Sequence, residues 1–330
     1  MRYSIIIPVY NRPDEVDELL ESLSGQSFRD FEVVVVEDGS TVPCEQVVQR
    51  YKDRLNVSYY SKPNSGPGQT RNYGADRSQG EYLLILDSDC VLPEGYLAAV
   101  EKELSACTAD AFGGPDRAHA SFSPIQKAIN YAMTSFFTTG GIRGGKKKLD
   151  KFYPRSFNMG IRAEVYRALG GFSAMRFGED IDFSIRIFKG GYACRLFPGA
   201  WVWHKRRTDL KKFFKQVYNS GIARINLYKK YPESLKLVHL LPAVFTLGCV
   251  SLLVVGILAF PYALLLLALF SLIIFVDSSC RNRSLFIGLL SVLAAFIQLI
   301  GYGTGFLVAW WKRCVCGGSA FSAFDKKFYE

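Results

Sequence analysis

Residues 82–89 join an apolar run, Tyr82-Leu83-Leu84-Ile85-Leu86, to the acidic triplet Asp87-Ser88-Asp89. The run has the length and composition of a buried β-strand, and the triplet follows where that strand ends. Residues i and i+2 of an extended segment point to the same side, so both carboxylates can converge there. Paired hard oxygen ligands suit Mg²⁺ or Mn²⁺, which usually bind partly through substrate phosphates. The alternative is a pair of solvated turn acids after a buried strand.

The rest of the first 120 residues alternates strand-like and helix-like segments. Uninterrupted apolar strands that alternate with helices are typical of a mostly parallel, Rossmann-like α/β sheet with helices on both faces. The expected strands are Tyr3–Val9, Phe31–Val36, Val57–Tyr60 and Tyr82–Leu86, and the expected helices are Asp14–Ser24, Pro43–Arg54 and Gln69–Ser78.

Polar clusters follow three of these strands. Asn11-Arg12 follows the first, Glu37-Asp38-Gly39-Ser40 the second and Asp87-Ser88-Asp89 the fourth. Ligands of such sheets bind beyond the carboxyl ends of the strands, so we expect these clusters to share one site.

After residue 121 the pattern is less regular. We expect helices at Ile125–Phe137, Ala163–Leu169 and Glu179–Phe188, strands at Arg155–Met159 and Arg195–Trp203, and a basic loop at 143–155. Residues 211–230 mix aromatic and aliphatic residues with bases, as in helices that lie in a membrane interface. The loop holds a local charge sum of +5 and residues 205–230 hold +8, whereas the whole of residues 1–236 sums to +7.

Two long stretches near the C-terminal end lack Asp, Glu, Lys and Arg: 40 residues between Lys236 and Asp277, and 28 between Arg283 and Lys312. A bilayer span needs about 20 mostly apolar residues, so we predict multi-pass membrane attachment. The expected organisation is a soluble domain at 1–207, an amphipathic interfacial helix at 208–235, a transmembrane region at 236–312 and a tail at 313–330. The apolar segments of the transmembrane region are 237–259, 261–277 and 285–311.

Compartment and partners follow from the N-terminal end, the cysteines and the charge. The first apolar run is too short for a signal peptide, so we expect the soluble domain in the cytoplasm, on the inner membrane. The eight cysteines form no C-x-x-C pair, which fits a reducing compartment. The basic clusters favour contact with anionic membrane lipids, and without a nucleic-acid-binding motif we expect no nucleic acid partner.

Four motifs occur in order: Ile7-Pro8-Val9-Tyr10-Asn11-Arg12-Pro13, Val36-Glu37-Asp38-Gly39-Ser40, Asp87-Ser88-Asp89 and Gly178-Glu179-Asp180-Ile181-Asp182. Together they make the chain resemble a family 2 glycosyltransferase with the GT-A fold, of the membrane-anchored bacterial type. The resemblance covers residues 3 to about 207. One departure is Glu37, where the family usually has another aspartate.

The resemblance implies a site for a nucleotide sugar, a UDP- or GDP-sugar. Asp38 would bind the nucleotide base, against which Pro8, Val9 and Tyr10 would pack. Arg71 would approach the nucleotide and Asp87 the ribose. Asp89 would hold the Mg²⁺ or Mn²⁺ that bridges the diphosphate, with Asp87 and His204 as further candidate ligands. For His204 the alternative is an ordinary core or surface histidine.

The resemblance also implies the reacting groups. Asp180 would be the base that takes the proton of the acceptor hydroxyl, and a single base implies inversion at the anomeric carbon. Glu179 is the rival, and for both the alternative is a pair of helix-N-terminal acids favoured by the macrodipole. Asn158 and Gly160 would line the donor-sugar and acceptor pocket, unless they form an ordinary turn.

The implied activity is transfer of a sugar to a lipid-linked or other cell-envelope glycan at the cytoplasmic face, within polysaccharide biosynthesis. A polyprenyl-phosphate monoglycosyl transferase is an alternative. A processive synthase is disfavoured because the chain has no Gln-x-x-Arg-Trp string. A non-catalytic sugar-nucleotide-binding scaffold is the alternative from another class.

The topology carries a conflict. The positive-inside rule places Lys236, the Arg281/Arg283 pair and the Lys312/Arg313 pair all in the cytoplasm. A hairpin that turns near Phe260-Pro261-Tyr262 satisfies the first two. The last apolar segment must then re-enter, for instance by bending near Gly301, Gly303 and Gly305, or break the rule.

Overall fold

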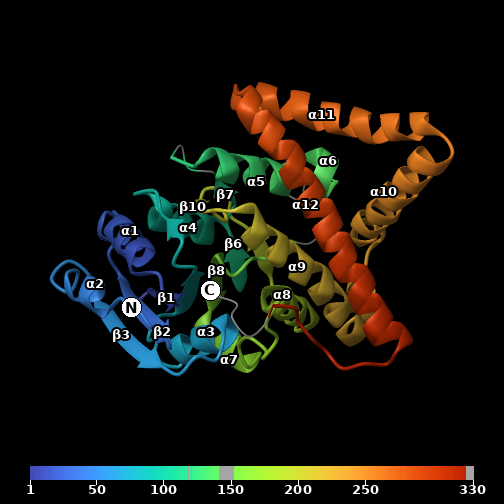
Figure 1. The fold of residues 1–330 in the computed structure, drawn as a ribbon. Coiled ribbons are helices and arrows are strands. Elements are labelled where there is room, and N and C mark those ends of the chain that lie inside the picture. The colour runs from blue at the N-terminus through green and yellow to red at the C-terminus, as the bar shows by residue number, and fades with distance from the viewer. Residues whose placement is uncertain (118, 120, 141–151, 325–330) are drawn as a thin grey trace. The chain divides into compact units, whose positions relative to one another are not determined.

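The computed structural model describes residues 1–117, 119, 121–140 and 152–324, and these form two compact units (Figure 1). The first unit contains the described residues up to 119 and those from 152 to 205. The second contains residues 121–140 and 206–324. Most of the predicted basic loop, residues 143–151, lies outside the described residues.

A seven-stranded, mostly parallel sheet forms the centre of the first unit, as predicted. Its strand order is β3-β2-β1-β4-β8-β6-β9, and only β8 runs antiparallel to its neighbours. The strands are β1 (Tyr3–Val9), β2 (Phe31–Asp38), β3 (Val57–Lys62), β4 (Tyr82–Leu86), β6 (Ala111–Gly113), β8 (Asn158–Arg162) and β9 (Cys194–Leu196).

Helices cover both faces of this sheet because its central strands are apolar on both sides. Alternate residues of β1 enter different cores, Ile5 and Ile7 one core and Ile6 the other. The first core includes residues of α1 (Pro13–Ser24), α2 (Glu45–Gln49) and α4 (Tyr96–Ala106), and the second includes residues of α3 (Pro67–Ala75), α7 (Ala163–Ala168) and α8 (Glu179–Lys189).

A second, three-stranded sheet has the order β5-β10-β7. Its strands are β5 (Cys90–Val91), β10 (Val202–His204) and β7 (Asp116–Arg117). Strand β10 pairs antiparallel with β5 and parallel with β7. This small sheet brings the end of the first unit beside the loop that follows β4.

Several predicted elements have different bounds in the structure. The predicted helix 43–54 is helical only at 45–49 and continues as turns. The predicted strand 195–203 divides into β9 and β10, because a turn closed by the bond from Ala200 N to Phe197 O interrupts it. The predicted strand 155–159 begins only at Asn158, since the bond from Asn158 N to Arg155 O closes a turn.

The helix predicted at 125–137 is two helices, α5 (Pro124–Thr134) and α6 (Phe136–Thr139). Ser135 separates them with extended backbone angles, φ −67° and ψ 143°. Its hydroxyl accepts a hydrogen bond from Phe137 N at 3.3 Å, so Ser135 caps the second helix.

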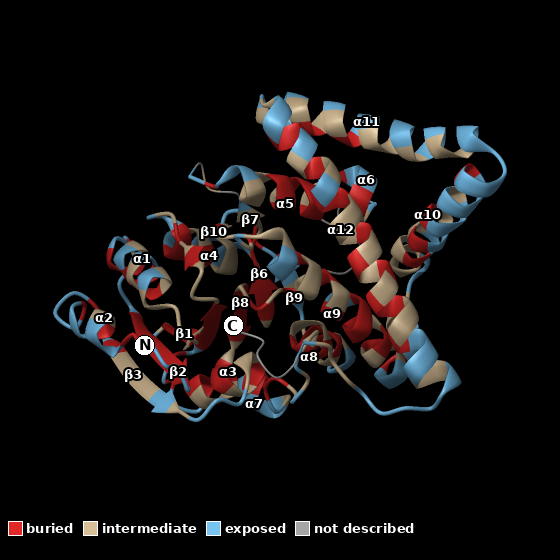
Figure 2. Ribbon diagram, viewed as in Figure 1, coloured by how far each residue is buried: buried red, intermediate tan, exposed pale blue. Residues whose placement is uncertain are grey.

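The second unit is helical, with α5, α6, α9 (Leu210–Lys230), α10 (Leu241–Leu258), α11 (Leu264–Asn282) and α12 (Leu285–Trp310). Among the described residues, three helices are long and apolar enough to cross a membrane: Leu237–Leu258, Pro261–Asn282 and Leu285–Val315. Figure 2 shows that α10 and α11 are largely exposed, as lipid-facing helices are. Helix α12 continues unbroken through its three glycines, so the bend considered there is absent.

The apolar residues of α9 pack inside the second unit. Phe213 and Val217 share a buried cluster with α5 and with Ala294 of α12, and Ile222 and Ile225 share another with Phe306. The apolar side of α9 therefore contacts protein, and a membrane-interface position for this helix stays a prediction.

Candidate functional site

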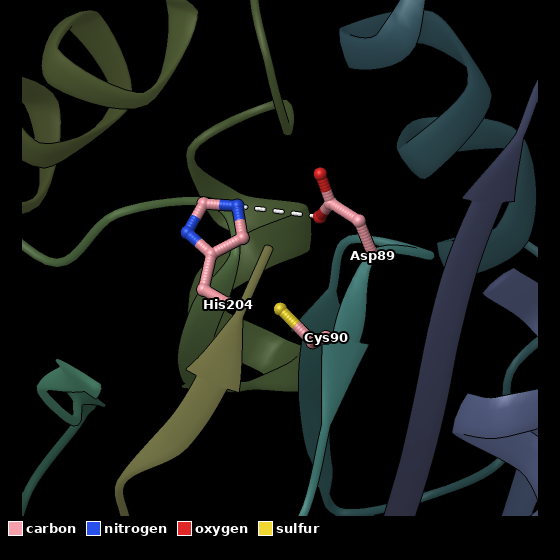
Figure 3. Close-up of side chains that lie close together, drawn as sticks. All are labelled: Asp89, Cys90 and His204. Carbon is pink, nitrogen blue, oxygen red and sulfur yellow. Dashed lines mark ion pairs between the residues drawn. The ribbon is translucent and has the colours of Figure 1, made fainter. Parts of the chain in front are cut away.

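Asp89 and His204 lie together at the small sheet. The Nε2 atom of His204 is 3.2 Å from the Oδ1 atom of Asp89, and Figure 3 shows the two side chains pointing toward one another. The pairing of His204 with Cys90 across β10 and β5 sets this contact. A hydrogen bond of 3.0 Å from Lys205 N to the Asp89 carbonyl fixes the two backbones.

The ring of His204 is held on two further sides. The Phe157 ring stacks on it at a centroid distance of 4.6 Å. The Nδ1 atom lies 4.0 Å from Oδ2 of Asp116, which belongs to the third strand of the small sheet. At 4.0 Å this contact is electrostatic and not a hydrogen bond, so the stacked Phe157 ring is the contact that orients the imidazole, with Nε2 toward Asp89.

The side chains of Asp89, Cys90 and His204 form a candidate metal site, because their ligand atoms all lie within 4.8 Å of one another. Cys90 is the poorest candidate of the three. It is buried, its sulfur lies 3.4 Å from the Phe157 carbonyl, and burial raises the pKa of its thiol well above the usual value. A carboxylate and an imidazole remain, and this donor pair fits a divalent cation whose other ligands are water or phosphate.

Glu15 adds to the negative charge near Asp89. Burial and the charge of Asp89 both raise the pKa of Glu15, although Arg12 pairs with it at 2.5 Å and opposes the shift. The charge of Lys205 opposes the same shift, so two basic residues offset the repulsion between Glu15 and Asp89.

Arg71 joins two of the predicted motifs. From α3, its Nη2 atom lies 2.7 Å from Oδ1 of Asp87 and its Nη1 atom 3.0 Å from Oε1 of Glu179. Only 4% of the Arg71 side chain and 10% of the Glu179 side chain are exposed, so this ion pair is shielded from water, whereas the Asp87 side chain is 31% exposed. Arg71 therefore fixes the acidic loop after β4 against the first residue of α8.

Glu179 and Asp180 differ in environment. Glu179 is buried against Arg71, and burial raises its pKa to about 7 even though the Arg71 charge opposes the shift. Asp180 is half-buried, and its Oδ2 atom lies 3.4 Å from Nε of Arg155. Its Oδ1 atom accepts a hydrogen bond from Ile181 N at 2.8 Å. Of the two acids, Asp180 is the more accessible.

Asp38 organises the loop that leads into α3. Its carboxylate pairs with Lys62 and accepts hydrogen bonds from Ser65 N at 2.9 Å and Gly66 N at 3.0 Å. Glu37 beside it is also buried, and it accepts from Cys44 N at 2.8 Å. Both acids thus hold backbone, and the predicted contact of Asp38 with a nucleotide base stays a prediction.

Pro8, Val9 and Tyr10 are placed beside these acids. Val9 pairs with Glu37 in the sheet and is buried, whereas Pro8 and Tyr10 are half-buried. The next residue, Asn11, has φ +54° and accepts hydrogen bonds from Thr41 N and Val42 N at 2.8 and 2.9 Å. The loops after β1 and β2 are tied together by this side chain.

Asn158 and Gly160 lie in β8, not in a turn. Asn158 pairs with Leu86, next to Asp87, but its side chain bonds Tyr96 Oη at 2.6 Å and the Ala200 carbonyl at 2.8 Å. A Cβ atom at Gly160 would lie 2.1 Å from the Phe112 ring, so packing accounts for the glycine. Their role in lining a sugar pocket stays a prediction.

The structure thus connects Arg71, Asp87 and Glu179 directly, and it joins Asp89 to His204. Sequence reasoning missed Asp116, Phe157 and Arg155. Nothing in the local sequence marks them, because each acts through a partner brought near by strand pairing or by a loop.

The fold is that of a class of glycosyltransferases, and comparison with known proteins agrees. The model of the glycosyl transferase family 2 matches residues 4–170, and that of glycosyl transferase family group 2 matches residues 152–307. The chain belongs to glycosyl transferase family 2.

The chain is similar to several named relatives. It is 46% identical over 196 residues to an uncharacterized glycosyltransferase of Haemophilus influenzae. This alignment covers 56% of this chain and 62% of the relative. It is 43% identical over 93 residues to the poly(ribitol-phosphate) β-N-acetylglucosaminyltransferase TarS of Staphylococcus aureus, covering 27% of this chain and 16% of TarS. The chain thus spans only part of the length of these relatives.

Two further similarities are to a relative whose name includes a lipid-linked substrate and to a solved structure. A GalNAc(5)-diNAcBac-PP-undecaprenol β-1,3-glucosyltransferase of Campylobacter jejuni is 31% identical over 115 residues, which is 34% of this chain and 37% of the relative. The mannosyltransferase PcManGT of Pyrobaculum calidifontis, solved with GDP-Man and Mn²⁺, matches 94% of this chain and 88% of its own at 18% identity, with a TM-score of 0.66. At that identity the likeness shows the fold.

Proposed function

We propose that this family 2 glycosyltransferase transfers a sugar, with inversion, from a UDP- or GDP-sugar to a lipid-linked glycan at the cytoplasmic membrane face. The observation that carries the proposal is the pairing of Asp89 with His204 beside the Arg71 bridge. The lipid-linked acceptor is supported by the undecaprenol-linked substrate named for the Campylobacter relative and by the three apolar helices.

Asp89 and His204 would hold the divalent cation, with Asp87 close by. When bound, Mg²⁺ or Mn²⁺ would neutralise charge on the departing nucleoside diphosphate. Asp87 is held by Arg71 at 2.7 Å, which orients its carboxylate before substrate arrives. The stacked Phe157 ring keeps the His204 ring in place, and Oδ2 of Asp116 lies 4.0 Å from its Nδ1 atom.

Asp180 is assigned the role of base. An acceptor hydroxyl must lose its proton as it attacks the anomeric carbon, and a carboxylate within hydrogen-bonding reach takes it. The Nε atom of Arg155 lies 3.4 Å from Oδ2 of Asp180 and helps to hold this carboxylate in position. Glu179 forms an ion pair with Arg71 and has a raised pKa, so we assign it a positioning role.

The test uses the purified full chain with a panel of UDP- and GDP-sugars, each with Mn²⁺, Mg²⁺ or a chelator. We expect one donor to raise the melting temperature in the presence of metal, because a ligand of the native state stabilises it. Transfer is then measured with a polyprenyl-phosphate and with a polyprenyl-diphosphate saccharide as acceptors.

Mass spectrometry of the products separates the candidate activities. A sugar added to the lipid-linked saccharide supports the proposal, whereas a sugar on the lipid phosphate itself would make the protein a polyprenyl-phosphate monoglycosyl transferase. Donor binding without transfer to either acceptor would favour a sugar-nucleotide-binding scaffold.

A further inference from the structure

Helix α12 is long and apolar enough to cross a bilayer, yet it is only partly exposed. Its large exposed residues before the last turn are confined to the first nine positions: Leu285, Phe286, Leu289 and Leu293, with exposed fractions of 71%, 61%, 59% and 51%. Every residue from 294 to 309 is buried or half-buried within the described chain. By contrast, α10 and α11 expose large apolar residues along their whole length.

The cover over the second half of α12 is largely α9, which runs beside it in the same direction. Phe213 and Ala294 share one buried cluster, and a Cβ atom at Gly221 would lie 2.2 Å from the Tyr302 carbonyl. Farther along, Nη1 of Arg313 donates to Oδ1 of Asn226 at 2.8 Å. A Cβ atom at Gly301 would lie 2.6 Å from Cγ2 of Val217, so the two helices stay in contact from residue 301 to residue 313, about 20 Å along the helix axis.

This contact makes a transmembrane position of α12 unfavourable, because α9 would have to enter the bilayer beside it. Lys215 and Arg224 lie within the contacting part of α9. A charged side chain at the centre of a bilayer is strongly unfavourable. Helix α9 also has bases at both ends, Lys211, Lys212, Lys229 and Lys230.

The hairpin formed by α10 and α11 gives an independent argument, because both of its open ends rest on α12. A Cβ atom at Gly303 would lie 2.3 Å from the carbonyl of Pro242, at the beginning of α10. A Cβ atom at Gly288 would lie 1.9 Å from the hydroxyl of Ser279, near the end of α11. The two contacts on α12, at Gly303 and Gly288, are about 22 Å apart along the helix axis.

A hairpin that enters a membrane has its two open ends at the same face of the bilayer. A helix that connects those ends over about 22 Å runs along that face rather than across it. Further contacts hold both helices of the hairpin against α12. Thr246 of α10 lies against Gly303, and the hydroxyl of Ser278 in α11 donates to that of Ser291 at 2.7 Å.

We propose that only the α10–α11 hairpin is inserted into the bilayer and that α12 lies along the membrane surface. Lipid would contact α12 through its exposed first residues and through Trp310 and Trp311 at its end, residues typical of the membrane interface. The N- and C-terminal ends of α12 then lie on one side of the membrane, the side on which α9 lies.

This arrangement satisfies the positive-inside rule for all three basic clusters. Lys236 precedes the hairpin, Arg281 and Arg283 follow it, and Lys312 and Arg313 follow α12. All three lie on the same side if the hairpin alone is inserted, whereas a crossing α12 would move the last cluster to the opposite side. The inference does not depend on the transfer chemistry.

The test labels cysteines in sealed vesicles and in spheroplasts with a membrane-impermeant maleimide, and maps labelled peptides by mass spectrometry. Two sites are compared in the full chain: the native, exposed Cys316 and a cysteine introduced by Lys236→Cys at an exposed position. We expect both to react from the same side. Reaction from opposite sides would show that α12 crosses and would overturn the proposal.

A third variant, Tyr262→Cys, places a cysteine at the exposed turn of the hairpin. We expect it to react from the side opposite to Lys236→Cys. Reaction from the same side would show that the hairpin does not cross the bilayer and would overturn the proposal. The compartment in which Cys316 and Lys236→Cys react is a separate result. It decides whether the catalytic unit is cytoplasmic, and therefore bears on the proposed function alone.

Discussion

Nε2 of His204 lies 3.2 Å from Oδ1 of Asp89, although the two residues are far apart in the sequence. Two short strands, β5 and β10, create this contact by pairing Cys90 with His204. The acidic loop after β4 is therefore joined to the last strand of the first unit by this pair of side chains. A metal ion bound there would depend on both residues.

Replacing either member of this pair should impair metal-dependent transfer. For Asp89→Asn and His204→Ala we expect the transfer rate to fall by at least about 100-fold, or about 3 kcal/mol of transition-state stabilisation. The apparent affinity for Mn²⁺, measured by titrating activity or protein stability, should fall in parallel. The matched control is Asp53→Asn, at an exposed acid on the same unit. Transfer by Asp89→Asn at the wild-type rate would contradict the assignment of Asp89 as a metal ligand.

The two acids at the start of α8 should give different kinetic effects. Asp180→Asn should lower kcat by about 10²–10⁴-fold with little change in donor affinity, because it removes a proton acceptor. Glu179→Gln should retain more activity, because it changes a partner of Arg71 and not the assigned base. Donor affinity and single-turnover rates separate the two effects, and an inactive Glu179→Gln beside a fully active Asp180→Asn would reverse the assignment.

Loss of the Arg71 bridge should destabilise the fold. Arg71→Met leaves the carboxylate of Glu179 buried without its cation, and breaking a buried ion pair in this way costs about 3–5 kcal/mol. The double variant Arg71→Met/Glu179→Gln should recover part of that loss, since no buried charge then remains at Glu179. Chemical denaturation measures both, and equal stability of the single and double variants would argue against the buried pair.

Glu179 should also make stability depend on pH. Burial raises its pKa from 4.5 to about 7 in the folded protein. Between these values the unfolded chain has released the proton that the folded chain still holds, so the free energy of unfolding falls as pH rises from 4.5 to 7. Below 4.5 and above 7 this contribution is constant. Denaturation of wild type and Glu179→Gln across this range should show a flatter profile for the variant.

The sequence predicted the central sheet well because its signals are local. Strands β1 and β4 have the predicted bounds, Tyr3–Val9 and Tyr82–Leu86, since each is rich in apolar residues and is followed by polar ones. The position of Asp87 and Asp89 follows from the end of β4. Their approach to Arg71 required knowledge of where α3 packs, which no local pattern contains.

The small sheet could not be predicted for the same physical reason. Strands β5 and β7 have two residues each and β10 has three, too few for a periodic pattern. Their pairing depends on segments that meet only in the folded chain. Asp116 and Phe157, which surround His204, were therefore missed, as was the capping by Ser135 that divides the helix predicted at 125–137.

The proposed position of α12 predicts unequal tolerance of charge on two helices that are equally apolar. Leu272, in α11, and Leu289, in α12, have similar exposed fractions, 55% and 59%. Leu272→Lys would place a charge deep in the bilayer, at about 2.5–3.5 kcal/mol on insertion scales. Leu289→Lys would place it at the membrane surface, where anionic lipid attracts it by about 1 kcal/mol. We expect Leu272→Lys to reduce the amount of protein in the membrane fraction and Leu289→Lys to leave it near wild type.

The uncharged variants Leu272→Gln and Leu289→Gln control for loss of apolar contact. Equal losses for the two lysine variants, beyond those of their glutamine controls, would indicate that α12 also spans the bilayer.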